Sequence, residues 1–277
     1  MRWTDRQRAM LREIGIPAFW PVEAAPVDPA DTVDAMVPVA PVDPVAAVVP
    51  PAPVSAQAPK ASTSKTATPT AVADAVLNPL PDGIDTMAWQ PLRQAVSNCQ
   101  ACGLCHSRTQ PVFGVGHEQA DWMFVGEAPG ELEDTQGEPF VDHAGQMLDR
   151  MLEAVGLTRT EGEPSSRVFI TNVLKCRPPA SRNPVAQEVD QCTPYLMRQI
   201  ALVQPKVVVA MGRFAVQALL KSAEPIGKLR GQVHHVAGVP VVVTYHPAYL
   251  LRRPVDKALA WDDLCLAREI LAKATSA

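Results

Sequence analysis

Polar residues follow three short apolar runs of this 277-residue chain, and their types could support catalysis. Residues 126–140 join clustered carboxylates to a turn that contains Gly and Pro. Residues 170–179 add an amide and several basic side chains, and residues 245–252 add Tyr, His and Arg. Because α/β folds bind ligands at the carboxyl ends of their strands, we expect the three groups to form one site.

Five of the six cysteines have a spacing that suits a metal centre. They are Cys99, Cys102, Cys105, Cys176 and Cys192. Four thiolates suit either a tetrahedral zinc site or an iron–sulfur cluster, and the spacing leaves both open. Ordinary buried cysteines are the alternative, which the close C-x2-C-x2-C grouping disfavours. Cys265 falls on the apolar face of a predicted helix and is assigned to the core.

Apolar patterns predict an α/β fold around these residues. The β-branched run at 207–211 is typical of strands buried in parallel sheets. Ala237-Gly238 separates two strand-like runs and predicts a hairpin. Apolar stripes at helical spacing predict helices at 144–157 and 256–272. Strands that alternate with helices predict a sheet covered by helices on both faces.

The N-terminal third differs in composition from the rest of the chain. Residues 1–20 can form an amphipathic helix, which we expect to dock on a partner or back on the domain. Residues 21–85 are rich in Pro, Ala and Val, contain no aromatic residue, and predict a disordered, extended linker. The folded domain is therefore expected at 86–277.

Charge and hydropathy exclude several classes of protein. The net charge is −4, and residues 21–85 hold eight acidic residues against Lys60 and Lys65, so the remainder is near neutral. A nucleic-acid surface would then be a local basic patch. The sequence has no run of about 18 apolar residues and no secretory signal, so we expect no membrane span and a cytoplasmic protein, in the bacterial cytosol and nucleoid.

Read together, the motifs resemble family 4 uracil-DNA glycosylases, the iron–sulfur branch of the uracil-DNA glycosylase superfamily, over about residues 92–270. The matching segments are Asn98-Cys99-x-x-Cys102, Gly126-Glu127-Ala128-Pro129-Gly130, Glu133-Asp134, Pro139-Phe140-Val141, Thr171-Asn172-Val173, Lys175-Cys176-Arg177-Pro178-Pro179, Cys192 and His246-Pro247-Ala248-Tyr249-Leu250-Leu251-Arg252. The resemblance implies a three-layer α/β/α sandwich with a mainly parallel four-stranded central sheet. It also implies a 4Fe–4S cluster held by Cys99, Cys102, Cys176 and Cys192, with Cys105 as a non-ligand.

The implied activity is excision of uracil from single- or double-stranded DNA, which releases the free base and leaves an abasic site. Such an enzyme must flip the nucleotide out of the stack and read its Watson–Crick edge. Asn172 offers a donor and an acceptor that suit uracil and reject cytosine. Phe140 can stack on the flipped ring, and His246 can donate to O2 as the glycosidic bond breaks.

The loop at 126–140 departs from the best-known uracil glycosylases. Ala128 lies in the substrate-binding loop where those enzymes have a water-activating aspartate, so hydrolysis rests more on leaving-group stabilisation and on Glu127. Glu127 and Glu133 are candidates for holding the attacking water or stabilising the oxocarbenium-like sugar. For Glu133 the alternative is a solvated loop carboxylate. Asp142 stands where the family more often has glycine.

The segment after His246 is expected to contact DNA. Leu250 and Leu251 would form an exposed wedge that fills the vacated stack, and Arg252 would hold a flanking phosphate. Two other functions stay open: a non-catalytic, metal-stapled module that binds nucleic acid or a replication partner, and a glycosylase for another damaged base.

The resemblance and the N-terminal segment also lead to expectations about partners. Residues 1–20 loosely resemble the N-terminal peptide of the psi subunit of the bacterial replicative polymerase. They are therefore a candidate docking peptide for a protein of the replication machinery. We expect the chain itself to be a monomer.

Overall fold

The computed structural model describes residue 13 and residues 77–160 and 162–275. Apart from residue 13, the predicted N-terminal helix at 1–20 lies outside the described residues, as does the predicted linker up to residue 76. Among the helices of the described part, none is long and apolar enough to cross a membrane.

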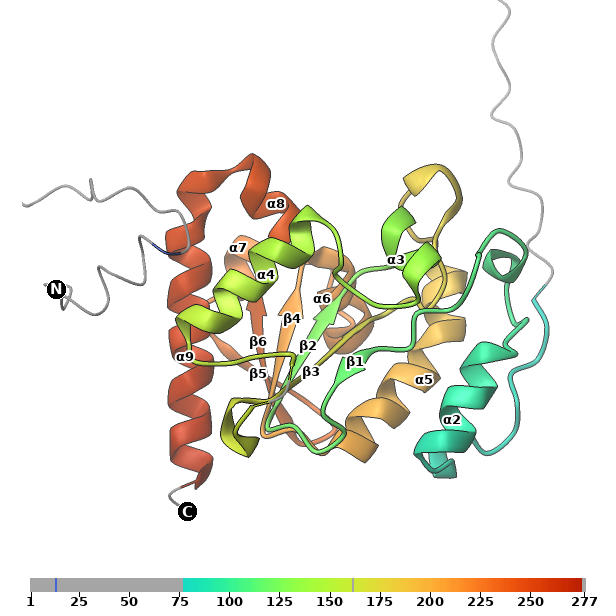
Figure 1. Cartoon of the computed structure of the whole chain (residues 1–277), viewed down its shortest axis with the longest axis horizontal. Coiled ribbons are helices and arrows are strands. Elements are labelled where there is room, and N and C mark those ends of the chain that lie inside the picture. The colour runs from blue at the N-terminus through green and yellow to red at the C-terminus, as the bar shows by residue number, and fades with distance from the viewer. Residues whose placement is uncertain (1–12, 14–76, 161, 276–277) are drawn as a thin grey trace, which may run out of the picture. The chain divides into compact units, whose positions relative to one another are not determined.

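One mixed sheet forms the centre of the described domain (Figure 1). Its six strands are β1 (Val115–Gly116), β2 (Trp122–Gly126), β3 (Val168–Asn172), β4 (Val207–Met211), β5 (Val233–Val236) and β6 (Val239–Thr244), in the spatial order β1-β3-β2-β4-β6-β5. The four inner strands are parallel, while β1 and β5 are antiparallel edges. The predicted four-stranded parallel sheet is thus present, but two short edge strands extend it to six in the described residues.

Helices cover both faces of the sheet, which confirms the predicted α/β/α class. The helices are α2 (Trp89–Ser97), α3 (Glu131–Gln136), α4 (His143–Ala154), α5 (Ala186–Val203), α6 (Arg213–Leu220), α7 (Ile226–Leu229), α8 (Pro247–Arg252) and α9 (Lys257–Thr275). In Figure 1, α4 and α9 lie on one side of the sheet and α2 and α5 on the other. Short 3-10 turns complete the chain at Ile84–Thr86, Gly103–His106, Pro164–Ser166, Pro179–Ser181 and Pro254–Asp256.

Alternating residues of the inner strands feed two apolar cores. In β2, Met123 and Val125 join the core under α2, α5 and α6, whereas Trp122 and Phe124 join the core under α4 and α9. Every residue of β2, β3 and β4 is buried, as expected for parallel strands covered on both faces. This packing fixes the carboxyl ends of β2, β3, β4 and β6 along one edge of the sheet.

The folded part begins earlier than the predicted boundary at residue 86. The backbone amide of Asn78 donates to the Ala101 carbonyl at 3.1 Å, and its side chain donates to the Gln100 carbonyl at 2.7 Å. Ile84 is buried in the core that contains α2 and α5. Composition assigned these residues to the linker because Pro and Asp dominate them, but local hydrogen bonds and one apolar anchor attach them to the domain.

The hairpin predicted at Ala237-Gly238 is present between β5 and β6. Both turn residues have positive φ, 49° at Ala237 and 83° at Gly238, as a two-residue turn between twisted strands requires. The hairpin directs β6 back through the sheet, so that the segment after Thr244 emerges beside the ends of the other inner strands.

Candidate active site and cysteine cavity

Asn172 and Phe140 meet at Gly126, where β2 ends. Gly126 and Asn172 are the last residues of neighbouring parallel strands and are paired in register. A Cβ atom on Gly126 would lie 2.4 Å from Asn172 Oδ1 and 2.6 Å from Phe140 Cζ. Any side chain at position 126 would therefore displace them. The predicted amide and aromatic ring converge over this bare backbone.

His246 reaches the same place from the end of β6. Its ring centroid lies 5.5 Å from that of Phe140, with an interplanar angle of 30°. Gly212, which follows β4, has φ 89°, and a Cβ atom there would lie 3.1 Å from His246 Cβ. The ends of all four parallel strands thus contribute, and the structure brings Asn172, Phe140 and His246 together as predicted.

Asn172 presents an unpaired acceptor to this pocket. The residue is 2% exposed, and its Oδ1 has no hydrogen-bond partner among the described residues. An unpaired buried polar group costs about 1–3 kcal/mol. Native structures keep such groups mainly where a ligand or another functional demand accounts for them. The unpaired Oδ1 of Asn172 is therefore available to accept a hydrogen bond from a ligand.

The imidazole of His246 is held neutral and in a defined orientation. His246 is the N-cap of α8, and its Nδ1 accepts a hydrogen bond from the Ala248 amide at 3.3 Å. Burial lowers the pKa of His246 to about 4; Asp142 partly opposes this shift and Arg252 adds to it. With Nδ1 acting as an acceptor, the proton of the neutral ring resides on Nε2. His246 is thus a hydrogen-bond donor at neutral pH.

The two predicted carboxylates have different surroundings. Glu133 is buried, and its Oε1 accepts from the Val141 amide at 3.3 Å, which ties α3 to the turn that carries Phe140. Its Oε2 has no partner among the described residues. Glu127 is half-buried; burial raises the pKa of its carboxyl, and Arg213 partly opposes this. Glu133 therefore has a structural contact that Glu127 lacks.

Arg159, which the sequence did not single out, supports the turn that carries Phe140, and Asp142, which it did, caps the helix that follows. Phe140 has φ 57°, which is strained for a side chain of this size. Arg159 Nη1 donates to the Phe140 carbonyl at 2.9 Å and to the Pro139 carbonyl at 3.1 Å, while its Nε pairs with Asp149 at 2.6 Å. Asp142 caps α4 by accepting from the Gly145 amide at 3.0 Å.

Only one of the two leucines predicted to form a wedge is exposed. Leu250 is fully buried in the core with Met147 and Trp261, so its assignment as an exposed DNA contact is wrong. It falls on the inward face of the short helix α8, which two adjacent apolar letters cannot reveal. Leu251 is 44% exposed, and Arg252 beside it is also exposed.

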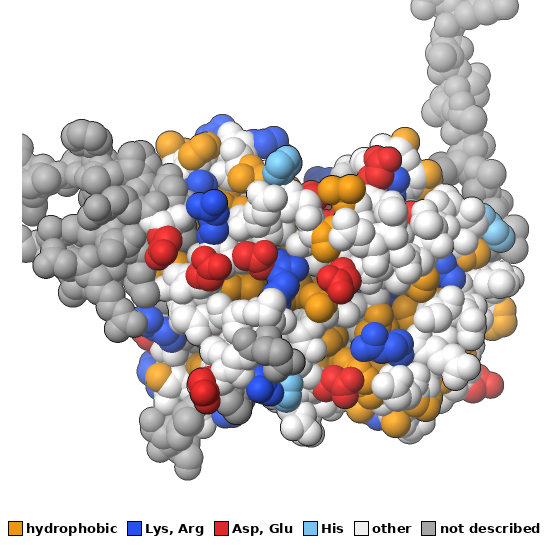
Figure 2. Space-filling view, in the orientation of Figure 1, with side chains coloured by type: hydrophobic (Ala, Val, Ile, Leu, Met, Phe, Trp, Pro, Cys, Tyr) orange, Lys and Arg blue, Asp and Glu red, His pale blue; other side chains and the backbone are white. Residues whose placement is uncertain are grey.

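The exposed residues around α8 form a local patch rather than part of a large basic field. Figure 2 shows basic and acidic side chains interspersed over this face of the molecule, with basic and hydrophobic side chains gathered above α8. The exposed residues there are Leu251, Arg252, Arg253 and Val255. This agrees with the expectation that any nucleic-acid contact depends on a local patch. By contrast, the basic side chain of Arg230 pairs internally with Asp263 at 3.0 Å.

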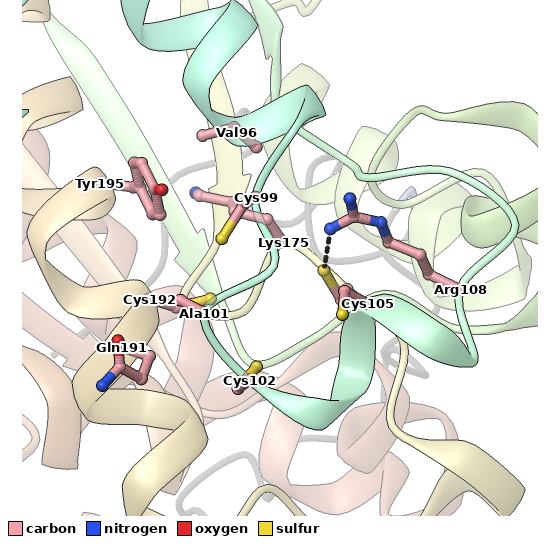
Figure 3. A pocket seen from close by; sticks show the side chains of 11 residues that line it. Val96, Cys99, Ala101, Cys102, Cys105, Arg108, Lys175, Gln191, Cys192 and Tyr195 are labelled. Carbon is pink, nitrogen blue, oxygen red and sulfur yellow. Dashed lines mark hydrogen bonds between the residues drawn. The ribbon is translucent and has the colours of Figure 1, made fainter. Parts of the chain in front are cut away.

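The five clustered cysteines line one cavity, shown in Figure 3, with a volume of about 10 Å³. Cys99 and Cys102 follow α2, Cys105 lies in the turn Gly103–His106, Cys176 follows β3, and Cys192 lies within α5. Among residues 77–160 and 162–275, no group of three His, Cys, Asp or Glu side chains is arranged to hold a single metal ion.

Burial and nearby cations define the electrostatics of this cavity. Burial raises the pKa of Cys176 to about 11 and that of Cys192 to about 12. Arg108 opposes the shift at Cys176 by donating from Nη1 to its Sγ at 3.0 Å. Arg108 and Lys175 are both among the lining residues, and none of those residues is a carboxylate. The cavity thus offers sulfur donors and positive charge.

Comparisons with known proteins agree with this arrangement. The family model of the Uracil DNA glycosylase superfamily matches residues 113–265, and the chain belongs to this superfamily. It is 44% identical to a type-4 uracil-DNA glycosylase of Archaeoglobus fulgidus over 167 residues, which is 57% of this chain and 81% of that protein. It is 40% identical to a type-4 enzyme of Pyrobaculum aerophilum, covering 65% of this chain and 93% of that protein. A type-5 enzyme of the latter organism is 36% identical over 51% of this chain and 67% of its own length.

Proposed function

We propose that this chain is a uracil-DNA glycosylase, which hydrolyses the N-glycosidic bond of deoxyuridine in DNA and so begins base excision repair. The observation that carries this function is the unpaired Asn172 Oδ1, buried beside Phe140 and His246 at the ends of the parallel strands. Membership of the superfamily and the names of the similar type-4 enzymes support it.

Uracil recognition rests on the amide of Asn172. Its Oδ1 accepts from uracil N3–H, and its Nδ2 donates to uracil O4. Cytosine carries an acceptor at N3 and an amino group at position 4, so the same amide would face mismatched groups. Phe140 stacks on the flipped ring. The side chain of Ala128 packs against the cysteine-lined cluster, so we expect the backbone of Ala128, and not its methyl group, to face the base.

Bond cleavage depends on the leaving group. The C1′–N1 bond breaks with its electron pair moving into uracil, and negative charge gathers on O2, where Nε2–H of neutral His246 donates. A water oxygen bonds to C1′ and its proton is released, while uracil gains a proton at N1. Glu127 is the carboxylate we assign to holding this water, because the buried carboxylate of Glu133 already braces the Phe140 turn.

The residues of α8 contact the DNA beside the uracil site. Leu251 enters the space that the flipped nucleotide leaves, and Arg252 contacts a neighbouring phosphate. These residues directly follow His246, so the wedge and the leaving-group donor move as one unit with the helix that His246 caps.

The residues of the cysteine cavity fit a 4Fe–4S cluster held by Cys99, Cys102, Cys176 and Cys192. The donors are soft thiols from three separate segments, and Arg108 and Lys175 supply positive charge for an anionic cluster. Cys105 is the spare thiol. When bound, the cluster joins the loop after α2, the loop after β3, and α5 into one unit, and so supports the strand end that carries Asn172.

Two assays test this function. The purified chain is incubated with a single-stranded and a double-stranded oligonucleotide that contain one uracil, and free base is measured. Release of uracil is expected; release of hypoxanthine or of mismatched thymine but not uracil would indicate a different glycosylase, and binding without release would indicate a non-catalytic module. For the cluster we expect bound iron and a broad absorbance at about 400 nm, whereas a colourless protein that contains zinc would exclude an iron–sulfur cluster.

The N-terminal segment extends the proposal to partners and location. Residues 1–20 would dock on a replication protein, with the segment after them as a tether that raises the local concentration of the enzyme near DNA. The enzyme would then act as a monomer in the cytoplasm. Deletion of residues 1–76 should leave uracil release from an oligonucleotide unchanged; a large loss of intrinsic activity would contradict the tether.

A further inference from the structure

Lys175 is a fully buried lysine that lies between the two sites. It is 2% exposed and lines the cysteine cavity. Its Nζ donates to Thr171 Oγ1, to the Asn172 carbonyl and to Gln199 Oε1, each at 2.7 Å. An ammonium group has three protons, and all three are used here. The side chain is therefore held in one position.

The acceptors of Lys175 form the frame around Asn172. Thr171 Oγ1 in turn donates to the Phe113 carbonyl at 2.8 Å, and Gln199 Nε2 donates to the same carbonyl at 2.9 Å. These bonds connect β3, α5 and the segment before β1. The ammonium sits at the centre of the frame and directly fixes the peptide carbonyl of the residue whose amide enters the uracil pocket.

The charge of Lys175 has no carboxylate partner among these contacts, since all three acceptors are neutral oxygens. A buried charge requires compensation from nearby opposite charge. Burial lowers the pKa of Lys175 to about 7, and thiolates at Cys192 and Cys176 oppose this shift. Both are ligands in the proposed cluster site. Lys175 thus borders the cysteine cavity on one side and the frame of Asn172 on the other.

We propose that Lys175 is a positioning residue that couples the cysteine site to uracil recognition. Its charge supports the anionic four-thiolate site, and its hydrogen bonds hold the Asn172 peptide so that the amide faces the base. The proposal rests on the proposed function. It adds a specific route by which the state of the cysteine site affects the position of Asn172.

Three variants test it: Lys175→Met, Lys175→Gln and, as a matched control, Lys206→Met. Methionine keeps most of the length of the side chain but has no charge and no donors. Glutamine keeps two N–H donors without charge. Lys206 pairs with Asp121 at the surface and touches neither site. For each protein we would measure bound iron and sulfide, the midpoint potential of the cluster, kcat and KM on a uracil oligonucleotide, and the preference for uracil over cytosine.

In iron-loaded protein, Lys175→Met is expected to lower kcat by about 10–100-fold, the usual range for residues that support a metal site or its ligands. It should also weaken the preference for uracil over cytosine. The midpoint potential should fall in both Lys175 variants, because removing a nearby positive charge disfavours the more negative reduced cluster. Lys175→Gln should recover part of kcat without recovering the potential. Lys206→Met should match the wild-type chain throughout.

Two results would overturn the coupling. One is a Lys175→Met enzyme with wild-type kcat and an unchanged potential. The other is a loss of activity that only follows the loss of iron, with kcat per loaded molecule unchanged. If Lys175→Met fails to fold, Lys175→Gln decides by the same criteria. Failure of the wild-type chain to release uracil would refute the proposed function instead, while the potential shift would still test the link between Lys175 and the cluster.

Discussion

The uracil pocket and the cysteine cavity lie at opposite ends of one short segment, residues 172–176, but they are built in different ways. The pocket is formed at the ends of four parallel strands whose residues are buried and hydrogen-bonded in register. The cysteines of the cavity come from two loops, a 3-10 turn and one helix, and none lies in a strand. The sheet therefore preorganises the pocket, whereas the cavity depends on what its thiols bind.

The difference extends to the unsatisfied groups at each site. At the uracil site, Asn172 Oδ1 and Glu133 Oε2 both lack a hydrogen-bond partner in the described residues, and Asn172 Oδ1 is the acceptor we assign to the base. The cavity gathers thiols whose ionisation burial disfavours, next to two cations. Recognition of a base needs a few fixed polar atoms, and binding of a metal cluster needs many soft donors. Each prediction below perturbs one site and asks whether the other responds.

The largest effect is expected from Asn172→Ala. Loss of a directional contact that counts in the transition state lowers kcat/KM on the order of 10²–10³-fold. Stability and iron content should be retained, because the variant also removes an unpaired buried acceptor. Gln119→Ala, an exposed amide before β2, is the control. Activity is read as uracil release and stability by thermal unfolding. A variant with wild-type kcat/KM would show that the amide does not read the base.

A comparison of bound iron in Cys192→Ser and Cys105→Ser distinguishes a proposed cluster ligand from the spare thiol. Loss of one ligand should reduce bound iron by at least about tenfold, because second-shell changes alone weaken metal sites by 10–100-fold. Cys105→Ser should keep its iron and visible absorbance. Equal loss of iron in both variants would contradict the assignment of Cys105. The Cys192→Ser protein should lose a larger fraction of its activity than of its secondary structure, which circular dichroism measures.

Arg159→Met is expected to loosen Phe140 without touching substrate. Misplacement of a positioning group by about 1 Å can cost 10²-fold in rate, and Arg159 binds two carbonyls of the strained turn. We therefore expect a fall in kcat/KM of about 10–100-fold, with iron content unchanged. Arg159→Lys, which keeps one donor group, should recover part of it. Arg268→Met, an exposed residue on α9, should have no effect on uracil release.

The residues of the proposed uracil site could be predicted from the sequence, but the residues that hold them in place could not. Asn172, Phe140 and His246 follow apolar runs that form neighbouring parallel strands, so their convergence could be inferred from strand ends alone. Arg159 could not be found in this way, because its role depends on carbonyl groups of a turn some 20 residues earlier, which carry no side-chain signal. Of the two antiparallel edge strands, β5 belongs to the predicted hairpin, whereas β1 was missed because it has only two residues.

The leucine pair shows a second limit of the sequence. Leu250 and Leu251 are chemically identical, and only the direction of a six-residue helix decides that one is buried and the other exposed. The segment 78–85 shows a third limit, because a linker-like composition can still be anchored by Ile84 and the hydrogen bonds of Asn78. In each case the deciding information is three-dimensional packing, which residue types alone do not specify.

Leu251→Ala and Leu250→Ala should therefore give different phenotypes. Leu251→Ala should reduce uracil release from double-stranded DNA by about tenfold and from single-stranded DNA much less, because only the duplex has a stack to refill. Its stability should not change. Leu250→Ala leaves a cavity in the core and should lower the free energy of unfolding by about 2–5 kcal/mol. Similar losses on both DNA forms in Leu251→Ala would argue against the wedge.

The last prediction concerns His246 and pH. Its pKa is lowered to about 4 in the folded protein, below the ordinary value of 6.5. Between these two pH values the unfolded chain binds more protons, so His246 contributes stability that is present above pH 6.5 and is lost as pH falls toward 4. His246→Asn should flatten this part of the pH dependence of unfolding, whereas His235→Asn, an exposed residue on β5, should not.

The pH experiment is best read as a difference between variants. The cysteine site is identical in the wild-type chain and in both histidine variants, so any acid sensitivity of a bound cluster cancels when their unfolding curves are subtracted. What remains is the titration of the pocket alone. A difference curve that stays flat between pH 7 and the folded pKa of about 4 would mean that His246 is not held neutral by burial. The leaving-group donor would then have to be assigned to a charged imidazole.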